Sequence, residues 1–286
     1  MPIIFLNGNF LPEDEATISP LDRGFIFGDG VYEVIPVYGA NLFRIEEHLQ
    51  RLDNSLSAIR LKNPYTRQQW LEFFKTLINK NGNGDQSLYL QISRGKAVRD
   101  HSIPDGVVPT VFMMCSALKR PSQDVIENGI SAVSCADFRW KKCHIKSISL
   151  IANVLLRQYA VDNGAVESIL IRDGEVTEGA ASNIFVVVDG TLITPPKGPL
   201  LLPGITRDLI LEIAQQNNIA SAEATLTVGQ LNQASEIMLS SSTKEILPVT
   251  QLDDKPMGNG KPGPIYEKLY SLYQVYKNQL RNGELA

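Results

Sequence analysis

The sequence predicts an α/β fold, in which a small α+β domain precedes a larger α/β domain. Apolar residues recur at steps of three and four between Ile45 and Arg60, the spacing of a helix with one buried face, whereas Ser87–Ser93 alternates like a strand. Helical and strand patterns are mixed in the same way in the second half. The chain has 286 residues, 43% of them apolar, which is enough to bury two cores.

One proline-containing segment is the best candidate for a domain boundary. We place the small domain at residues 1–118, a linker at residues 119–123 and the larger domain at residues 124–286. The linker contains Pro121, and prolines commonly interrupt regular structure. No internal repeat or low-complexity segment argues for a different division.

Composition excludes several classes of function. The net charge is −4 and the basic residues are scattered, so no basic stripe for nucleic acid is present. No apolar run approaches membrane-spanning length, and the first residues lack the pattern of a signal peptide. The three cysteines form no CxxC pair and the three histidines show no zinc spacing, so we expect no metal and a cytoplasmic protein.

The expected elements follow the apolar periods and the turn residues along the chain. In the first half we expect a hairpin, a glycine-rich loop, three strands and two helices: Ile3–Leu6 with Asn9–Leu11, loop Ser19–Gly30, strands Val31–Tyr38, Ser87–Ser93 and Pro109–Ala117, helix Ile45–Arg60, and a helix from Thr66 to Asn79. In the second half we expect four strands and three helices: Gly129–Ala136, Glu167–Ile171, Ile184–Val188 and Ile237–Leu239, then Leu150–Asn163, Asp208–Asn217 and Gly263–Leu280.

Lys146 is the first candidate for chemistry. Lys141 and Lys142 stand in a polar run and look solvated, whereas Lys146 follows Ile145 at the point where the chain turns apolar. Burial disfavours the charged form of a lysine and frees its amine as a nucleophile. The alternative is a lysine whose stem is buried at a helix start while its ammonium group stays in water.

Three further candidates are polar side chains at turns. Arg99 and His101 are two apart, so in an extended segment both point to one face, where they could hold a carboxylate or phosphate; the alternative is a solvated basic loop. Glu178 is followed by small residues that leave room for a bulky group, and its carboxylate could keep the ring nitrogen of a heterocycle protonated. The alternative is an ordinary turn glutamate.

Two segments could bind an anion through N–H groups and hydroxyls. Gly204-Ile205-Thr206 precedes an expected helix, whose first N–H groups attract phosphate, although it could equally be an ordinary cap. Ser240-Ser241-Ser242-Thr243 follows an expected strand and offers a second cluster of hydroxyls. Arg51 lies off the apolar stripe of its helix, so the pattern predicts that it is solvated.

The order of these motifs resembles that of the fold-type IV pyridoxal-phosphate-dependent enzymes, from about Ile3 to the last helix. This class includes D-amino-acid aminotransferases, branched-chain aminotransferases and aminodeoxychorismate lyases. The segments that carry the resemblance are Asp22-Arg23-Gly24, Phe27-Gly28-Asp29-Gly30-Val31-Tyr32-Glu33, Arg51-Leu52, Ile145-Lys146-Ser147, Thr177-Glu178-Gly179 with Ser182-Asn183, Gly204-Ile205-Thr206-Arg207, and Ser241-Ser242-Thr243 with Glu245.

The resemblance implies roles for the matching residues and a cofactor, pyridoxal 5′-phosphate, between the two domains. Lys146 would form the Schiff base and move the proton between the substrate Cα and the cofactor's C4′, while Glu178 would pair with the pyridinium nitrogen. Leu202 would pack on the ring and Tyr32 would face the substrate. The phosphate would be held by Arg51, Ile205, Thr206, Ser241 and Ser242, which overturns the solvated expectation for Arg51.

The loop containing Arg99, His101 and Pro104 is most similar to that of the D-amino-acid aminotransferases. The resemblance implies a homodimer in which Arg99 and His101 reach the neighbouring active site and, with Tyr32, bind the substrate α-carboxylate. It also implies a ping-pong transamination that converts D-amino acids to 2-oxo acids, with 2-oxoglutarate or pyruvate as acceptor. Ala180-Ala181 departs from the serines common in relatives.

Two other functions stay open. The nearer is the same fold acting on branched-chain L-amino acids or as an aminodeoxychorismate lyase, against which the Arg99 and His101 loop argues. The farther is a non-enzymatic α/β protein in which Lys146 is only a surface lysine with a buried stem. The visible absorbance of a bound cofactor separates the farther alternative, and a comparison of D- and L-amino acids separates the nearer one.

Overall fold

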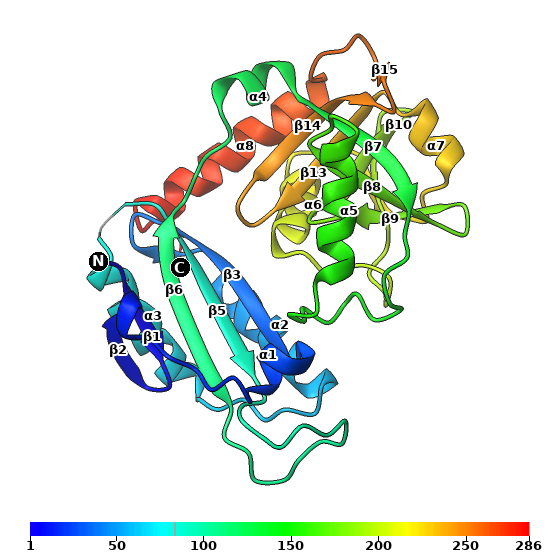
Figure 1. The fold of residues 1–286 in the computed structure, drawn as a ribbon. Helices are drawn as coiled ribbons and strands as arrows, with labels where there is room; N and C mark the ends of the chain where they lie inside the picture. Colours follow the sequence, from blue (N-terminus) through cyan, green and yellow to red (C-terminus); the bar gives the residue numbers. More distant parts are fainter. Residues whose placement is uncertain (83, 286) are drawn as a thin grey trace. The chain divides into compact units, whose positions relative to one another are not determined.

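The computed structural model describes residues 1–82 and 84–285, and these form two compact units. The first unit contains Met1–Leu118, Ile145–Leu150 and the chain from Asn278; the second contains Lys119–His144 and Ile151–Lys277. Both units combine helices with a sheet, as the α/β prediction requires (Figure 1).

The first unit is built on an antiparallel sheet with the strand order β2-β1-β6-β5-β3-β4. Helices α2 and α3 pack against this sheet. The elements are β1 (Ile3–Leu6), β2 (Asn9–Pro12), a 3-10 turn (Glu13–Glu15), α1 (Arg23–Phe27), β3 (Gly30–Tyr38), β4 (Asn41–Leu42), α2 (Ile45–Ala58), α3 (Arg67–Lys80), β5 (Gln86–Ser93) and β6 (Thr110–Ala117).

The apolar stripe predicted on α2 lies in the core of the first unit. Leu52 and Leu56 are buried there with Phe74 of α3 and Val31 of β3. Ile145 belongs to the same core, although it is far away in the sequence. Burial of Ile145 fixes the short segment that carries Lys146 beside β3.

The second unit contains a mixed sheet with the strand order β12-β11-β10-β13-β14-β7-β8-β9, and β15 pairs with β14. Helix α5 packs against β7 and β8, and α6 packs against β13. The elements are α4 (Gln123–Asn128), β7 (Ile130–Ala136), α5 (Ile151–Asp162), β8 (Glu167–Arg172), β9 (Glu175–Gly179), β10 (Asn183–Val188), β11 (Thr191–Thr194), α6 (Ile205–Gln216), β12 (Ser221–Glu223), α7 (Val228–Gln233), β13 (Glu236–Ser241), β14 (Glu245–Leu252), β15 (Lys255–Pro256) and α8 (Pro264–Arg281), of which α8 extends into the first unit.

Most expected elements are present within a few residues of their predicted bounds, and several differences have local causes. The segment expected as loop Ser19–Gly30 contains α1, because the Asp22 side chain accepts a hydrogen bond from the N–H of Gly24 and caps the helix. Helix α6 begins three residues earlier than predicted, since Gly204 is its N-cap. The short elements α4, β9, α7, β12, β14 and β15 were not predicted. None of the described helices is long and apolar enough to cross a membrane.

Candidate active site

Lys146 lies beside strand β3 in the first unit. Its carbonyl accepts a hydrogen bond from the N–H of Tyr32 (2.9 Å), and its own N–H donates to Ser55 Oγ (3.2 Å). The next residue, Ser147, forms a bridge with Val31. These bonds hold the backbone of Lys146 against the strand, five residues before α5 begins, so Lys146 is not a helix-start lysine.

The side chain of Lys146 is directed to the face of β3 that carries Tyr32. Its Nζ lies 4.2 Å from the centroid of the Tyr32 ring. Lys146 is half-buried, whereas Lys141 and Lys142 are exposed, as the sequence predicts. The structure therefore gives one of the three lysines a partly desolvated amine next to a phenol.

Arg51 is buried, which contradicts the solvated position predicted from the α2 pattern. Glu33 of β3 accepts from Arg51 Nε and Nη2, both at 2.8 Å. The Nδ1 of His48 donates to the same carboxylate at 2.7 Å, because an ionised carboxylate can only accept. Although burial opposes ionisation, the Arg51 guanidinium holds the pKa of Glu33 well below its usual range. Arg51 thus has a fixed orientation.

Arg99 and His101 are exposed on the loop between β5 and β6. The Arg99 guanidinium carbon lies 5.4 Å from the centroid of the Phe27 ring, and the His101 ring lies 5.3 Å from the same ring. Two donors that contact one ring lie close enough to bind a single anionic group. This arrangement supports the prediction that both side chains point to one face.

Glu178 lies buried near the end of β9 in the second unit, so it is not an exposed turn glutamate. Its Oε1 accepts from Arg139 Nη1 at 2.5 Å, and its Oε2 accepts from Asn183 Nδ2 and the N–H of Leu202, both at 3.1 Å. A carboxylate has about four acceptor positions, so one position remains for another donor. Burial raises the pKa of Glu178 to about 7, although Arg139 and Leu202 favour its charged form.

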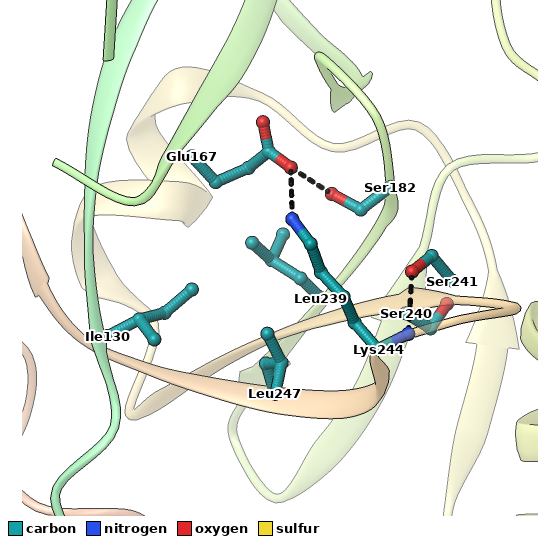
Figure 2. Close-up of a pocket in the computed structure, with 8 residues that line it drawn as sticks. All are labelled: Ile130, Glu167, Ser182, Leu239, Ser240, Ser241, Lys244 and Leu247. Carbon is teal, nitrogen blue, oxygen red and sulfur yellow. Dashed lines mark hydrogen bonds and ion pairs between the residues drawn. The ribbon is translucent and has the colours of Figure 1, made fainter. Parts of the chain in front are cut away.

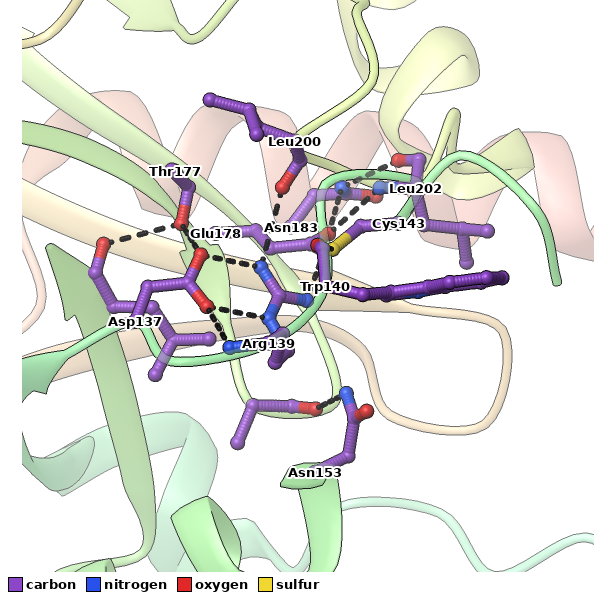
Figure 3. Close-up of polar contacts among 12 residues, drawn as sticks. Asp137, Arg139, Trp140, Cys143, Asn153, Thr177, Glu178, Asn183, Leu200 and Leu202 are labelled. Atoms are coloured by element: carbon purple, nitrogen blue, oxygen red, sulfur yellow. Dashed lines mark hydrogen bonds and ion pairs between the residues drawn. The ribbon is translucent and has the colours of Figure 1, made fainter. Parts of the chain in front are cut away.

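Arg139 connects Glu178 to a second buried carboxylate (Figure 3). Its Nε and Nη2 donate to the two oxygens of Asp137 at 2.9 and 3.0 Å. Thr177, the neighbour of Glu178 on β9, also donates to Asp137 through its hydroxyl (3.0 Å). One guanidinium group therefore balances two carboxylates and fixes the position of Glu178.

Asn183 brings the Glu178 turn to the start of α6. Besides its bond to Glu178, Asn183 Nδ2 donates to the carbonyl of Leu202 at 2.8 Å. Its Oδ1 lies 1.9 Å from where a Cβ on Gly204 would be, so any larger residue than glycine would collide with it. Gly204 is the N-cap of α6, and no side chain caps this helix. The buried Thr206 Oγ1 has no hydrogen-bond partner among the described residues.

The Ser240–Lys244 turn lies next to Asn183, because Asn183 pairs with Ser240 across β10 and β13. The Oγ of Ser240 is also buried without a partner in the described part of the chain. Below the turn is a small pocket in which Glu167 accepts a hydrogen bond from Ser182 (3.2 Å) and pairs with Lys244 (3.7 Å) (Figure 2). This buried carboxylate therefore connects the serine turn to the turn that follows Glu178.

The family of the chain follows from its similarity to known proteins. The family model of amino-transferase class IV matches residues 30–252. The chain belongs to the class IV aminotransferases. It is 41% identical to the D-alanine aminotransferase of Staphylococcus aureus strain N315, over 96% of this chain and 98% of that protein.

Solved branched-chain amino acid aminotransferases have the same fold as this class IV aminotransferase. That of Escherichia coli has a TM-score of 0.90 and 27% identity, covering 96% of this chain and 94% of the other. That of T.th., solved with pyridoxamine 5′-phosphate, has a TM-score of 0.89 and 26% identity, covering 98% of this chain and 95% of the other.

The class IV aminotransferases depend on pyridoxal phosphate, and the residues of this chain fit that cofactor. The orphaned hydroxyl of Thr206 stands at a helix N-terminus without a side-chain cap, which suits a phosphate. Glu178 has an acceptor position left for a ring N–H, and Lys146 supplies an amine. No group of three or more possible metal ligands occurs among the described residues.

Arg139, Asp137 and Asn183 were not proposed as site residues from the sequence. Arg139 stands in a polar run with two exposed lysines, so its pattern is that of a surface residue. The available signal was the spacing of Asp137 and Arg139, two residues apart at the end of an expected strand. Asn183 was part of a matching motif, but its three roles became visible only in the folded chain.

Proposed function

We propose that this class IV aminotransferase transfers the amino group of D-amino acids to a 2-oxo acid, with Lys146 as the catalytic residue. The pair formed by Arg99 and His101 against Phe27 carries the proposal, because it suits one α-carboxylate. The 41% identity to the D-alanine aminotransferase of S. aureus supports the same substrate class.

Lys146 supplies the amine that holds the cofactor and later moves a proton. Bound pyridoxal phosphate supplies a carbonyl carbon for the amino group and a ring that withdraws electrons from the substrate Cα. The amine of Lys146, once released by the incoming amino acid, accepts the Cα proton and returns it at C4′. Tyr32, whose ring lies 4.2 Å from Lys146 Nζ, faces the substrate.

Glu178 keeps a proton on the ring nitrogen. Its carboxylate stabilises that proton by charge pairing, which makes the ring a better electron acceptor. Arg139 favours the ionised form of Glu178 despite its burial. Leu202, whose N–H and carbonyl are bonded to Glu178 and Asn183, packs on the ring.

The phosphate is held by two neighbouring segments of the second unit and by Arg51. Ile205 and Thr206 offer the N–H groups and hydroxyl at the start of α6. Ser241 and Ser242 offer hydroxyls in the adjacent turn. Arg51, oriented by Glu33, adds a fixed positive charge. The cofactor would therefore be bound by both units, as the predicted location between two domains requires.

The protein acts as a homodimer in which the loop of one subunit completes the site of the other. Arg99 and His101 are exposed on the described chain, so they are accessible to a second copy. The three free cysteines support a cytoplasmic protein.

A branched-chain L-amino-acid aminotransferase is the second candidate. It is supported by the TM-score of 0.90 to the E. coli enzyme, at 27% identity. The test is a panel of D- and L-amino acids with 2-oxoglutarate or pyruvate as acceptor. The proposal requires that D-alanine or D-glutamate has a kcat/KM at least about tenfold above that of any L-amino acid. Preference for L-leucine or L-valine would overturn it in favour of the second candidate.

A further inference from the structure

The segment from Asp22 to Asp29 forms the base of the loop that carries Arg99 and His101. The loop leaves β5 at Ser93 and enters β6 at Thr110. The matching motif Asp22-Arg23-Gly24 has no role in the function proposed above. Its contacts with the loop give it one.

Asp22 ties the two ends of the loop together. This buried carboxylate accepts from Ser93 Oγ at 2.7 Å and from Thr110 Oγ1 at 2.6 Å. Gly24 lies so close that a Cβ at this position would be 2.6 Å from the Cβ of Ser93. The base of the loop is therefore rigid.

Asp29 binds two arginines at the same base. Its carboxylate accepts from Arg94 Nε and Nη2 at 2.8 and 3.0 Å, and from Arg23 Nε at 2.8 Å. Arg94 also donates to the carbonyl of Ile59 at 2.7 Å. Arg94 is thus bonded independently of Arg23, so the base keeps its arginine–carboxylate pair if Arg23 is replaced.

Arg23 extends from this base to the middle of the loop. Its Nη1 donates to the carbonyl of Asp100 at 2.6 Å, and Asp100 stands between Arg99 and His101. The guanidinium carbon of Arg23 also lies 4.8 Å from the centroid of the Phe27 ring, which both flanking side chains contact. The Arg23 side chain is almost completely buried.

We propose that Arg23 is a positioning residue for recognition of the substrate α-carboxylate. By holding the Asp100 carbonyl, it fixes the backbone between Arg99 and His101 so that both donors point to one carboxylate. The ligand class is an α-amino or 2-oxo carboxylate, and the inference rests on the carboxylate role proposed for the loop.

The test compares Arg23→Met with Arg23→Lys, Arg99→Ala and the control Arg67→Met. Methionine keeps the apolar stem against Phe27 but removes both hydrogen bonds. Lysine keeps the charge and can donate to Asp29 or Asp100, without the planar fork of arginine. Arg67 is a surface arginine paired with Glu46, away from the loop. All variants are compared as cofactor-loaded protein with wild-type thermal stability recorded first.

Two measurements are made on each variant. The first is the rate of tryptic cleavage after Arg99 in the folded protein, which reports the freedom of the loop without any enzyme activity. The second is KM and kcat for D-alanine and for 2-oxoglutarate, both of which have the carboxylate. We expect Arg23→Met to be cleaved at least about fivefold faster, since loop opening limits cleavage. We expect its KM to rise about tenfold with kcat within about threefold, and Arg23→Lys to be intermediate.

The outcomes separate the inference from the proposed function. If Arg99→Ala raises KM but Arg23→Met behaves like Arg67→Met, Arg23 has no positioning role and the inference is wrong. If cleavage of Arg23→Met is no faster than wild type, the inference is also wrong. If Arg23→Met is cleaved faster while neither it nor Arg99→Ala changes KM, the carboxylate role of the loop fails, and the inference fails with it.

Discussion

Arg139 and Glu178 form a buried ion pair, in which Arg139 Nη1 lies 2.5 Å from Glu178 Oε1. The same guanidinium group is bonded to Asp137, so one cation stabilises two carboxylates. Glu178 is the residue proposed to hold the proton on the cofactor ring. Its charge state therefore depends on a residue that does not touch the substrate.

Replacing Arg139 with methionine should impair catalysis more than cofactor binding. Without the cation, the pKa of Glu178 rises further and the neutral carboxyl cannot stabilise a ring N–H⁺. We expect kcat to fall about 10–100-fold, the range of acid–base groups, whereas the phosphate residues still bind the cofactor. Arg139→Lys, which keeps a positive charge, is the control. A kcat within about threefold of wild type in Arg139→Met would contradict this account.

The pKa of Glu178 also predicts how the stability of the cofactor-free protein depends on pH. Its folded value of about 7 is above the ordinary 4.5. Between these values the folded chain keeps a proton that the unfolded chain has lost, so this group's contribution to stability falls as the pH rises. Glutamine does not titrate, so the stability of wild type relative to Glu178→Gln should fall by up to about 3 kcal/mol between pH 4.5 and 7.

Urea unfolding of both proteins between pH 4.5 and 8 measures this difference. The comparison cancels all other titrating groups that the two proteins share. Parallel stability profiles would mean that the pKa of Glu178 is not raised in the folded chain.

Thr206→Val should weaken cofactor binding without weakening the fold. The Thr206 hydroxyl is buried and has no partner among the described residues, so its removal breaks no bond of the cofactor-free protein. A hydrogen bond to a charged phosphate is worth about 1.5–3 kcal/mol, so the Kd for pyridoxal phosphate should rise about 10–100-fold.

Thr194→Val is the matched control for Thr206→Val. Thr194 is equally buried, but its hydroxyl donates to the carbonyl of Ile184 at 2.7 Å. This variant should lose about 1 kcal/mol or more of stability and bind the cofactor normally. If the two variants behave alike, Thr206 is not a phosphate ligand.

Mixed dimers test whether Arg99 acts across a subunit interface. Arg99→Ala and Lys146→Ala should each be nearly inactive with D-alanine when pure. A mixed dimer combines the intact lysine of one subunit with the intact loop of the other, which should restore about one working site. Activity should therefore appear when the two are unfolded and refolded together. Mixtures that stay inactive would place Arg99 and Lys146 in the same subunit's site.

Elements with a clear period could be predicted from the sequence, and so could Lys146. The apolar stripe of α2 and the capping box at Thr66 are both present. The difference between Lys146 and its neighbours Lys141 and Lys142 was also correct, because it depends on the local change from polar to apolar residues.

Contacts between distant residues could not be predicted in this way. Arg51 is buried because Glu33, on another element, pairs with it; a test of helical period takes no account of such a partner. Glu178 is ion-paired to a residue 39 positions earlier, and β9 around it is too short and too rich in small residues to show a strand pattern. The site roles of Arg51 and Glu178 came from the family resemblance and stay predictions.

The most direct test of the central claim is to reduce the holoprotein with borohydride and locate the modified lysine by peptide mapping. The account predicts that the phosphopyridoxyl group is attached to Lys146 and not to Lys141 or Lys142. It further predicts that D-alanine, added without an oxo acid before reduction, releases Lys146 from modification, whereas L-alanine and L-leucine do not. Modification of a different lysine, or equal release by L-leucine, would contradict the account.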